Sequence, residues 1–530
     1  MTQNPTTAIN IVWLKRDLRL FDHAPLRAAS QAGAFMLLYC WEPAQWQGND
    51  YAAQHQAFIE ESLQALRTEL AFMGGSLTVS AVGIVETLTM IRQQRAIAGL
   101  FSHEETGNGA SFVVDKAVAK WCEYHHVTWQ EYAQNGVVRR LKNRNQWAKG
   151  WEERMRVTPL QIPTSWQACQ TVSLPSQAKI AAKGLDKPKR QRGGRARGLS
   201  ILEDFLAGRA ARYRGGISSP LSAVTAGSRL SPYLAYGALS MREVVQDSRA
   251  KRAELPQDST YARLHAGLLG FESRLHWHCH FMQKLESEPA IEFDNMHRAH
   301  DGMRDQHLAD VESQRRLQAW AAGQTGWPLV DACMAMLRAT GWLNFRMRAM
   351  LMSTASYLYW LHWRETGLNL AREFLDYEPG IHWAQTQMQS GTTGINTLRI
   401  YHPIKQAEAQ DPTGAFVRHW LPQLKNVPNT WIFEPYLMPK HLQLQYQCVL
   451  EKDYPLPIVD ITQAMRYAKQ AIASARSHPS AYNETRQVVQ KHASRKGGFG
   501  QKSRQAAAKS AVKNHQLAAQ TAQRDFFAED

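Results

Sequence analysis

The chain has 530 residues, of which 44% are hydrophobic, so wholesale disorder is excluded, and at roughly 150 residues per domain its length suits two to four domains. Its 62 Lys and Arg residues outnumber its 46 Asp and Glu residues. The net charge of +16 favours an anionic partner, with nucleic acid ahead of an anionic membrane surface, although a merely solvated basic surface is the alternative.

The first 135 residues alternate between short apolar runs and longer amphipathic segments. This alternation predicts an α/β domain over residues 1–135, built on a doubly wound parallel sheet. Such sheets bind ligands at the carboxyl ends of their strands. The predicted strands are Ile9–Leu14, Phe35–Tyr39, Leu77–Ser80, Ile97–Ser102 and Val127–Gln130, and the predicted helices are Tyr51–Met73, Ile84–Gln94 and Phe112–His125.

Residues 136–200 break this pattern. Lys and Arg crowd the stretch from Lys187 to Arg197, which we call the basic run, and Pro188, Gly193 and Gly194 interrupt it. This composition predicts an exposed linker. A flexible solvated connector and a nucleic-acid contact are both compatible with it.

From residue 201 to 484 the strand pattern vanishes, and long helical patterns such as Tyr261–Leu285, Pro328–Arg338 and Arg346–Trp363 predict a separate all-α domain. Residues 485–530 are rich in Lys and Arg and poor in large apolar side chains. We expect a basic, mobile tail that is helical in part at most. It could hold DNA through its phosphates or simply aid solubility.

No apolar run approaches the roughly 20 residues of a membrane span, and the N-terminus lacks the pattern of a secretory signal. The six cysteines form no CxxC pair, which suits a reducing compartment and argues against a zinc site. We therefore expect a cytoplasmic protein without a membrane partner, and we expect it to be a monomer.

Two stretches of the helical region indicate a polar site. Gly227-Ser228-Arg229-Leu230-Ser231 precedes a helix-like segment in which Ser231 can act as the cap and Pro232 as the first residue. Amides, hydroxyls and a cation at a helix start suit a phosphate, although simple capping is the alternative.

The second stretch contains Arg346 and Arg348 inside an apolar helical pattern. A buried Arg needs an acidic partner, and Asp376 and Glu378 follow further along the chain. The arrangement indicates either a structural ion pair or a polar site inside a helical bundle, where cofactors are often held.

Several motifs in a fixed order resemble the DNA photolyase/cryptochrome family, most densely between Trp320 and Pro403. Ile11–Leu20 resembles the opening strand of that family and the loop after it, and Leu230–Ser240 resembles its flavin-phosphate segment. Four further segments resemble its flavin-domain signature: Thr325–Ala332, Ala339–Trp342, Asp411–Gly414 and Val417-Arg418.

The resemblance implies an α/β antenna domain and a helical domain that holds FAD. It implies repair of UV-induced pyrimidine photoproducts in DNA by electron transfer from photoexcited reduced FAD, or, as the alternative, blue-light sensing by a cryptochrome without repair. Damaged DNA would bind through the basic surface, the linker and the tail. A second antenna chromophore, a folate, a deazaflavin or a flavin, would occupy the α/β domain.

The resemblance also assigns residues around the flavin. Arg348 and Asp376 would form an ion pair beside the isoalloxazine ring, and Glu378 would meet the ring or the ribityl chain. The FAD phosphates and ribityl chain would contact Tyr213, Gly227, Ser228, Arg229, Leu230 and Ser231.

The sequence departs from the family at the photochemical positions. His382 falls where photolyases commonly place Asn and plant cryptochromes Asp, facing flavin N5, and a histidine there could donate a hydrogen bond or hold a charge. Trp363 matches the middle member of the family's tryptophan chain, but its inner position falls on Thr386 or Ala384 and its outer position near Asp310. Candidate replacements are Trp342, Trp360, Trp383 and Tyr377, each of which could equally be a packing residue.

On the substrate side, Arg274 stands three residues before Trp277, where photolyases of cyclobutane dimers usually place Glu. Asn344 and Phe345 stand where animal-type (6-4) photolyases place two histidines. Neither lesion is therefore favoured, although all of these residues except Phe345 are candidates for catalysis together with His382 and Trp363.

Metal binding is not expected. The histidines at 276, 278 and 280 lack further ligands at a matching spacing, which favours polar or packing roles. The helical region holds only Cys279, Cys333 and Cys448, too few for the four-cysteine iron–sulfur cluster of one bacterial branch.

Overall fold

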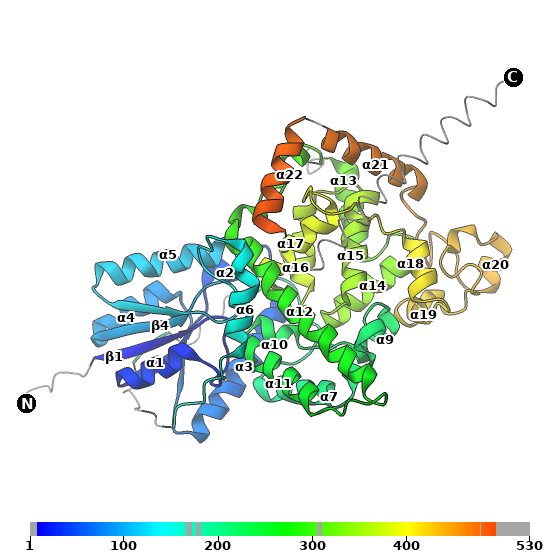
Figure 1. Ribbon diagram of the computed structural model, residues 1–530. Helices are drawn as coiled ribbons and strands as arrows, with labels where there is room; N and C mark the ends of the chain where they lie inside the picture. Colours follow the sequence, from blue (N-terminus) through cyan, green and yellow to red (C-terminus); the bar gives the residue numbers. More distant parts are fainter. Residues whose placement is uncertain are drawn as a thin grey trace, which may run out of the picture.

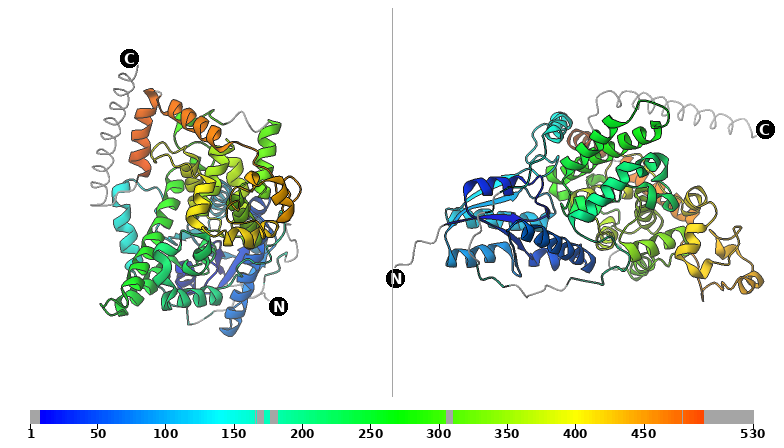
Figure 2. Two further views of the ribbon diagram at one scale, coloured as in Figure 1. Left: turned by 90° about the vertical axis from the view of Figure 1, so that its right-hand side faces the viewer. Right: turned by 90° about the horizontal axis from the view of Figure 1, so that it is seen from below.

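A computed structural model gives the fold of the chain. It describes residues 8–164, 166, 172–175, 182–304, 310–477 and 479–493. Figure 1 shows a sheet domain beside a larger helical body, and the view from below in Figure 2 shows the same two parts side by side. Cys169 and residues 494–530 of the expected tail lie outside the described residues.

The N-terminal domain is built on five parallel strands in the order β3-β2-β1-β4-β5. The central strands β1 and β2 are buried along their whole length, because helices cover both faces of the sheet. This confirms the predicted doubly wound α/β fold. The strands are β1 (Ile9–Leu14), β2 (Phe35–Cys40), β3 (Leu77–Ser80), β4 (Ile97–His103) and β5 (Thr128–Tyr132), and the helices are α1 (Ala24–Ala32), α2 (Pro43–Trp46), α3 (Ala53–Phe72), α4 (Ile84–Gln94) and α5 (Gly109–Tyr124).

The second domain is helical, as predicted. None of the helices in the described residues combines the length and the apolar character that a membrane span requires. The domain boundaries that we expect from the sequence stay predictions. The remaining helices are α6 (Trp147–Arg156), α7 (Arg195–Ala207), α8 (Tyr213–Gly216), α9 (Pro220–Ala226), α10 (Ser231–Ala235), α11 (Met241–Glu254), α12 (Ala262–Ser287), α13 (Val311–Ala322), α14 (Pro328–Thr340), α15 (Phe345–Ser353), α16 (Trp363–Glu373), α17 (Pro379–Ser390), α18 (Pro403–Gln410), α19 (Ala415–Trp420), α20 (Lys440–Gln445), α21 (Ile461–Ser477) and α22 (Pro479–His492).

One predicted helix is two helices in the structure. The pattern Arg346–Trp363 spans the end of α15, a π-helical turn at Thr354–Leu358 and the start of α16. Trp360 adopts a left-handed conformation with φ of 55°, which ends the helical path. The apolar pattern runs through the break because the residues on both sides of it are buried, so periodicity alone could not reveal it.

The basic run is not an exposed linker throughout, which corrects the prediction. Lys187 and Arg190 are buried. The Lys187 ammonium group binds the Glu373 carboxylate, and the Arg190 guanidinium group binds both Glu61 oxygens at 2.9 and 3.0 Å. Each buried cation has therefore found an acid from a distant segment, as buried charges require.

Helix α22 enters the segment that we expect to be a mobile tail. Its last residue, His492, is buried, and its Nε2 lies 2.5 Å from a carboxylate oxygen of Glu288 beyond the end of α12. The neighbouring Lys491 ammonium group lies 3.0 Å from the same carboxylate. The described part of the expected tail is thus a packed helix, because its cationic end meets an acid.

Candidate functional site

The predicted partners Arg348 and Asp376 meet. The guanidinium group on α15 donates two parallel hydrogen bonds of 2.9 Å to the two oxygens of the Asp376 carboxylate, in the loop before α17. Such bidentate pairs are the strongest and most directional ion pairs. Burial by itself would raise the pKa of Asp376, but the charge and hydrogen bonds of Arg348, with a hydrogen bond from Ser231, hold this pKa below its ordinary value.

The segment before α10 lies beside this pair. Arg229 has a left-handed backbone with φ of 63°, and its guanidinium carbon lies 3.8 Å from the centroid of the Trp342 ring. Burial lowers the pKa of Arg229 to about 10. Ser231 does not cap the helix as predicted: it is the first helical residue, and its hydroxyl group binds Asp376 instead.

Gly227, Ser228 and Leu230 complete this segment. Gly227 ends α9, and Leu230 is fully buried at the N-cap position of α10. Tyr213 is also buried and packs between the rings of Phe205 and Phe271 at 5.6 and 5.8 Å. Of these residues, Ser231 contacts the Arg348–Asp376 pair directly, and Arg229 lies close enough to interact electrostatically with both of its members.

His382 is buried on α17. Its Nε2 lies 2.8 Å from the carbonyl oxygen of Gly367, so Nε2 carries the hydrogen and donates it. Burial lowers the pKa of His382 to about 4, which makes the ring neutral near pH 7. In this tautomer Nδ1 can accept a hydrogen bond but cannot donate one.

Trp363 is the first residue of α16 and is fully buried. Its indole N–H donates to Asn295 Oδ1 at 2.8 Å, and its ring lies 6.0 Å from the Trp383 ring. Trp383 is in turn 4.9 Å from the His382 ring. Trp363 therefore has aromatic neighbours in Trp383 and in His362, whose ring stacks on it at 5.5 Å, rather than at position 386.

The two other tryptophan candidates lie elsewhere. The Trp342 ring lies against the guanidinium group of Arg229. Trp360 contacts Tyr467 at 4.9 Å, with the guanidinium carbon of Arg304 at 4.4 Å from its centroid. Neither contact joins Trp363, so neither tryptophan extends the Trp363–Trp383 pair.

The residues predicted on the substrate side lie at the start of α15 and along α12. Arg274 is exposed, and its guanidinium carbon lies 5.7 Å from the ring centroid of Phe345, which is 47% exposed. Trp277, half-buried on the same helix, contacts Phe281. Asn344 donates to the carbonyl oxygen of Ser218 at 2.7 Å, and its own Oδ1 is buried without a protein partner. The structure therefore places a cation and an aromatic ring together at the surface.

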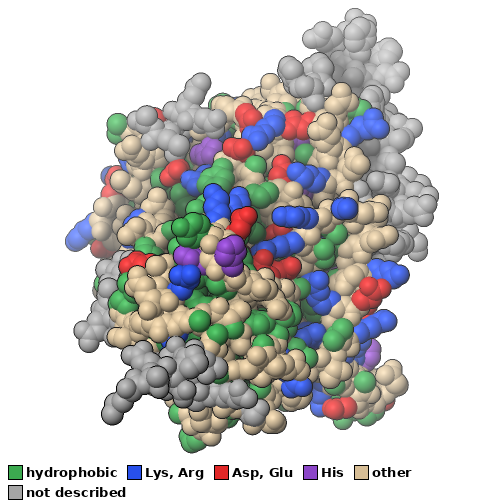
Figure 3. Space-filling model, turned by 90° about the vertical axis from the view of Figure 1, so that its left-hand side faces the viewer, with side chains coloured by type: hydrophobic (Ala, Val, Ile, Leu, Met, Phe, Trp, Pro, Cys, Tyr) green, Lys and Arg blue, Asp and Glu red, His purple; other side chains and the backbone are tan. Residues whose placement is uncertain are grey.

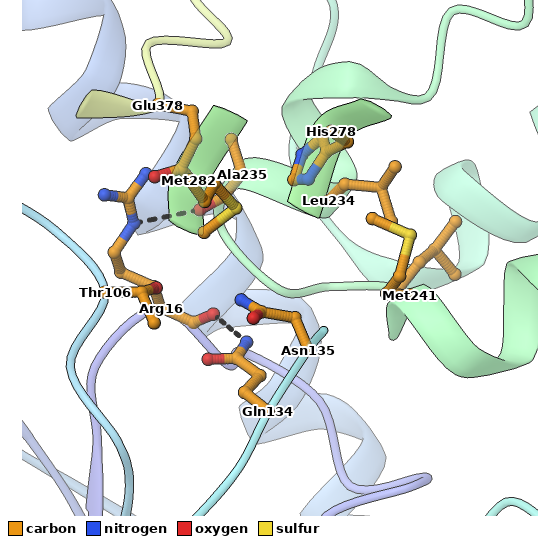
Figure 4. Close-up of a pocket in the computed structure, with 11 residues that line it drawn as sticks. Arg16, Thr106, Gln134, Asn135, Leu234, Ala235, Met241, His278, Met282 and Glu378 are labelled. Atoms are coloured by element: carbon orange, nitrogen blue, oxygen red, sulfur yellow. Dashed lines mark hydrogen bonds and ion pairs between the residues drawn. The ribbon is translucent and has the colours of Figure 1, made fainter. Parts of the chain in front are cut away.

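Glu378 turns away from the Arg348 pair and meets the α/β domain, a contact that sequence reasoning missed. Its Oε2 accepts a hydrogen bond of 2.9 Å from Arg16, in the loop after β1. The same guanidinium group donates to the carbonyl oxygen of Ala235 at 3.1 Å (Figure 4) and to that of Tyr377 at 3.2 Å. Burial outweighs the Arg16 charge and raises the pKa of Glu378 to about 7.

Side chains of the α/β domain bind the loop that carries Asp376. Besides Arg16, three of them, Asp50, Gln54 and His55, bind residues 372–377. Because several of these bonds use backbone atoms of the loop, they fix its path and not only its side chains. The contacts are Gln54 Nε2 to Arg372 O at 2.6 Å, His55 Nε2 to Phe374 O at 2.9 Å, and Tyr377 Oη to Asp50 Oδ2 at 2.9 Å.

Arg16 also lines two cavities. One of about 350 Å³ lies between the domains, and the Arg16, His278 and Glu378 side chains in its lining each keep one buried polar atom without a protein partner (Figure 4). The other, of about 690 Å³, opens at the carboxyl ends of β1, β2 and β4, where parallel sheets bind ligands. Its lining includes Trp13, Tyr39, Glu42, Tyr51 and Glu105.

A buried trio of Asp17, His23 and His103 fixes the loop that carries Arg16. One Asp17 oxygen lies 2.6 Å from His103 Nδ1 and 3.0 Å from His23 Nε2, and the other accepts the Lys15 backbone N–H at 2.7 Å. These residue types can also bind a metal ion. However, His103 Nδ1 and Asp17 are hydrogen-bonded, and His23 Nδ1 already accepts a backbone N–H, so these contacts account for the trio without a metal ion.

Two sequence families match the chain. The family described as the FAD binding domain of DNA photolyase matches residues 271–474, and that described as DNA photolyase matches residues 10–146. The chain belongs to the DNA photolyase/cryptochrome family. The segment at Gly227–Ser231 lies between the two matched regions.

Individual relatives of both kinds span the chain. It is 27% identical to a cryptochrome DASH of Gloeobacter violaceus (89% of this chain, 96% of that protein) and 28% identical to a deoxyribodipyrimidine photo-lyase of Salmonella typhimurium (88% and 99%). Its fold matches a Synechocystis cryptochrome (TM-score 0.76, 23% identity, 89% and 100% covered) and a class III photolyase of Agrobacterium tumefaciens (TM-score 0.77, 24% identity, 90% and 100%). Repair enzymes and cryptochromes are thus similarly close, which defines the family but not the activity.

The residues in place fit a flavin. Asn344 Oδ1 is a buried acceptor without a protein partner, and His382 Nδ1 is a second acceptor. An isoalloxazine ring and a ribityl chain carry the N–H and O–H groups that such acceptors need. The cation of Arg229 and the start of α10 suit the phosphates.

Proposed function

We propose that this protein is a light-dependent flavoprotein that repairs UV-induced pyrimidine photoproducts in DNA. The observation that carries the proposal is the half-buried, bidentate Arg348–Asp376 pair inside the FAD-binding domain of a photolyase-family chain. Reduced FAD, when bound, supplies the light-driven electron that splits the photoproduct. The protein supplies orientation and electrostatics.

The side chains around the pair have distinct roles in this proposal. Arg348 places a cation beside the ring, and Asp376 fixes that cation in one orientation. Arg229 and Ser231 hold the phosphate and ribityl end. His382, neutral and anchored to Gly367, presents Nδ1 as an acceptor toward the ring edge.

The lesion would enter between α12 and α15. A stacked base cannot approach a buried ring, so the damaged nucleotide must be flipped out of the duplex. Phe345 offers an exposed aromatic face for the flipped base, with Arg274 beside it for an adjacent phosphate, and Trp277 and Asn344 complete the entrance. The α/β end of the molecule mixes basic and acidic side chains (Figure 3), and this mixture does not favour that face for DNA.

A repair assay tests the proposal. FAD-loaded, reduced protein is illuminated with blue light in the presence of oligonucleotides that carry a cyclobutane dimer or a (6-4) product, with a dark sample as control. We expect light-dependent restoration of one of the two lesions. If a flavin-loaded preparation restores neither lesion, the repair function is wrong.

The second candidate function is blue-light sensing without repair. It is favoured by Arg274, Asn344 and Phe345, which replace the lesion-handling residues usual in both photolyase types. In that case DNA that carries either lesion stays unrepaired, while light still changes the flavin absorption spectrum. The repair assay and the spectrum together separate the two functions.

We also propose that the 690 Å³ cavity at the sheet edge holds a second chromophore. Its aromatic lining, with Trp13, Tyr39 and Tyr51, suits a flat ring system. A photolyase of Sulfolobus tokodaii with the same fold (TM-score 0.68, 23% identity, 88% of this chain and 100% of that chain) is described with two FAD molecules. Absorption spectra of the purified protein, before and after removal of FAD, test whether a second chromophore copurifies.

A further inference from the structure

A row of aromatic rings connects the α/β domain to the flavin loop. It runs from Trp41, after β2, through Trp46 on α2 and Tyr51 before α3 to Tyr377, which directly follows Asp376. The ring centroids are 5.2 Å apart for Trp41–Trp46, 5.5 Å for Trp46–Tyr51 and 5.4 Å for Tyr51–Tyr377. Tyr377 then lies 5.1 Å from the His382 ring.

The row leads from the surface to the interior. Trp41 is half-buried and reaches solvent, whereas Trp46, Tyr51 and Tyr377 are 1%, 4% and 1% exposed. Each ring touches the next, with no aliphatic side chain or solvent gap between neighbours. The far end lies beside Asp376 and His382, the two residues that we place against the isoalloxazine ring.

The usual tryptophan chain of the family has no such connection here. Its middle member, Trp363, is fully buried, and its indole N–H is held by Asn295. The inner position of that chain falls on Thr386 or Ala384 and the outer position near Asp310, and none of these residues is aromatic. The Trp363–Trp383 pair is therefore a buried pair of tryptophans whose further ring contacts, His362 and His382, are histidines, which are harder to oxidise.

We propose that Trp41, Trp46, Tyr51 and Tyr377 form the route by which electrons from solution reach light-excited FAD in this protein. The proposal rests on the proposed function in one respect, that FAD is bound beside Asp376. It goes beyond it by assigning an electron path through the α/β domain, and it gives Tyr377 the role of immediate donor.

The structure provides for the proton that a phenol must release on oxidation. Tyr377 Oη donates a hydrogen bond of 2.9 Å to Asp50 Oδ2, and Asn108 Nδ2 binds the same oxygen at 2.7 Å. When Tyr377 gives one electron to the flavin, its phenol proton moves to the Asp50 carboxylate. Burial raises the pKa of Asp50, which favours this transfer.

The remaining steps restore Tyr377. An electron that passes from Trp41 to Trp46 and then across the Tyr51 ring refills Tyr377, and the proton returns from Asp50 to the phenol oxygen. Tyr51 keeps its phenol proton and bridges Trp46 and Tyr377 without being oxidised. Trp41 loses its indole proton to water and becomes a neutral radical. A thiol reductant in solution then gives one electron and one proton to Trp41 and is itself oxidised toward a disulfide. The sum is one electron taken from a thiol for each electron delivered.

Trp46 supports a role beyond packing. Its indole N–H is buried without a hydrogen-bond partner. An unsatisfied buried donor costs stability, and a Phe at this position would avoid that cost at the expense of a smaller ring. An oxidisable ring at this point of the row gives a reason for the tryptophan.

The test uses the full-length, FAD-loaded protein with oxidised flavin and a thiol, followed by flash photolysis and electron paramagnetic resonance. In Trp46→Phe we expect loss of the long-lived aromatic radical and slower flavin photoreduction. Tyr377→Phe should lose the tyrosyl signal. In the native protein, flavin photoreduction should be slower in heavy water because the Tyr377 proton moves with the electron. Asp50→Asn should abolish this slowing. Trp121→Phe removes a buried tryptophan of the same domain outside the row and should behave as the native protein does.

Flavin content, measured from the absorption spectrum, separates this proposal from the proposed function. A native protein that cannot be loaded with FAD contradicts the proposed function. If the native protein binds FAD and photoreduces it, and Trp46→Phe does so at the native rate with an unchanged radical signal, the route is wrong. Loss of photoreduction in Trp363→Phe, with Trp46→Phe unaffected, would overturn it in favour of the buried pair.

Discussion

Asp376 and Glu378 lie two residues apart in one loop, both are buried, and both have an Arg partner, yet they ionise differently. Asp376 receives two hydrogen bonds from Arg348 and one from Ser231, and its pKa is lowered. Glu378 receives one from Arg16 and keeps a buried oxygen without a partner, and its pKa is raised to about 7. The number of hydrogen bonds to the charged form, rather than the presence of a cation, separates the two acids.

The same difference separates the two sides of the loop. Asp376 is held by the helical domain, through a pair that the resemblance and the need of a buried Arg for an acid both predict. Glu378 is held by Arg16 of the α/β domain. The first pair would fix charge beside the flavin in the proposed function, and the second joins the loop to the other domain.

The largest effect is expected when the Asp376 side is broken. Arg348→Leu leaves Asp376 buried and unpaired, so we expect a loss of about 3–5 kcal/mol in the free energy of unfolding, together with loss of FAD. Urea denaturation and flavin absorbance measure the two effects. Arg348→Lys keeps the charge but not the bidentate geometry and should lose less. A stable, FAD-loaded Arg348→Leu protein would remove the pair from the site.

Titration of Glu378 is the next test. An unfolded Glu releases its proton near pH 4.5, whereas folded Glu378 holds it to about pH 7, so this group makes unfolding easier as the pH rises between these values. The native protein should therefore lose up to about 3 kcal/mol relative to Glu378→Gln between pH 5 and pH 8. Denaturation of both proteins across this range measures the difference. A pH-independent difference would mean that Glu378 is ionised throughout.

Breaking the α/β side should have a smaller effect on stability but a specific effect on flavin. Arg16→Gln removes hydrogen bonds to Ala235, Tyr377 and Glu378, and we expect a loss of about 1–3 kcal/mol and weaker FAD binding. The matched control is Arg242→Gln, which breaks the interdomain pair with Asp22 but contacts no residue of the loop. Equal FAD affinities in the two variants would mean that Arg16 only joins the domains.

The smallest effect is expected at His382. His382→Asn restores the residue common in photolyases and should change the free energy of unfolding by about 1 kcal/mol or less at pH 7, because the lost donor to Gly367 is replaced by an amide. The flavin spectrum and the yield of the radical state should change, since the acceptor Nδ1 is replaced. Identical spectra would place His382 away from the ring.

Local patterns predicted the fold well. The strands β1 and β3 and the helix Ile84–Gln94 have the predicted bounds. Strand and helix patterns can be recognised from a few neighbouring residues, which is why these bounds could be predicted. The Arg348–Asp376 pair could be predicted because an Arg inside an apolar helix needs an acid. The role of each residue in flavin binding stays a prediction.

What failed depends on contacts that no local window contains. Arg16 and Glu378 are 362 positions apart, so their pairing has no trace in periodicity. The same is true of Ser231, which binds Asp376 instead of capping α10 as expected, and of Lys187, which binds Glu373 in α16. Polar partners chosen across the interior are set by tertiary packing, which sequence spacing does not describe.

The contacts of Arg16, Asp50 and His55 with the Asp376 loop have a practical consequence for recombining these proteins. A chimera that joined the helical domain of this chain to the α/β domain of a relative would cut through the cofactor site, although the junction would lie far from it in sequence. Such a hybrid would need these three side chains on its new partner. For the proposed flavin site to be kept, both domains would have to be transferred together, not the FAD-binding domain alone.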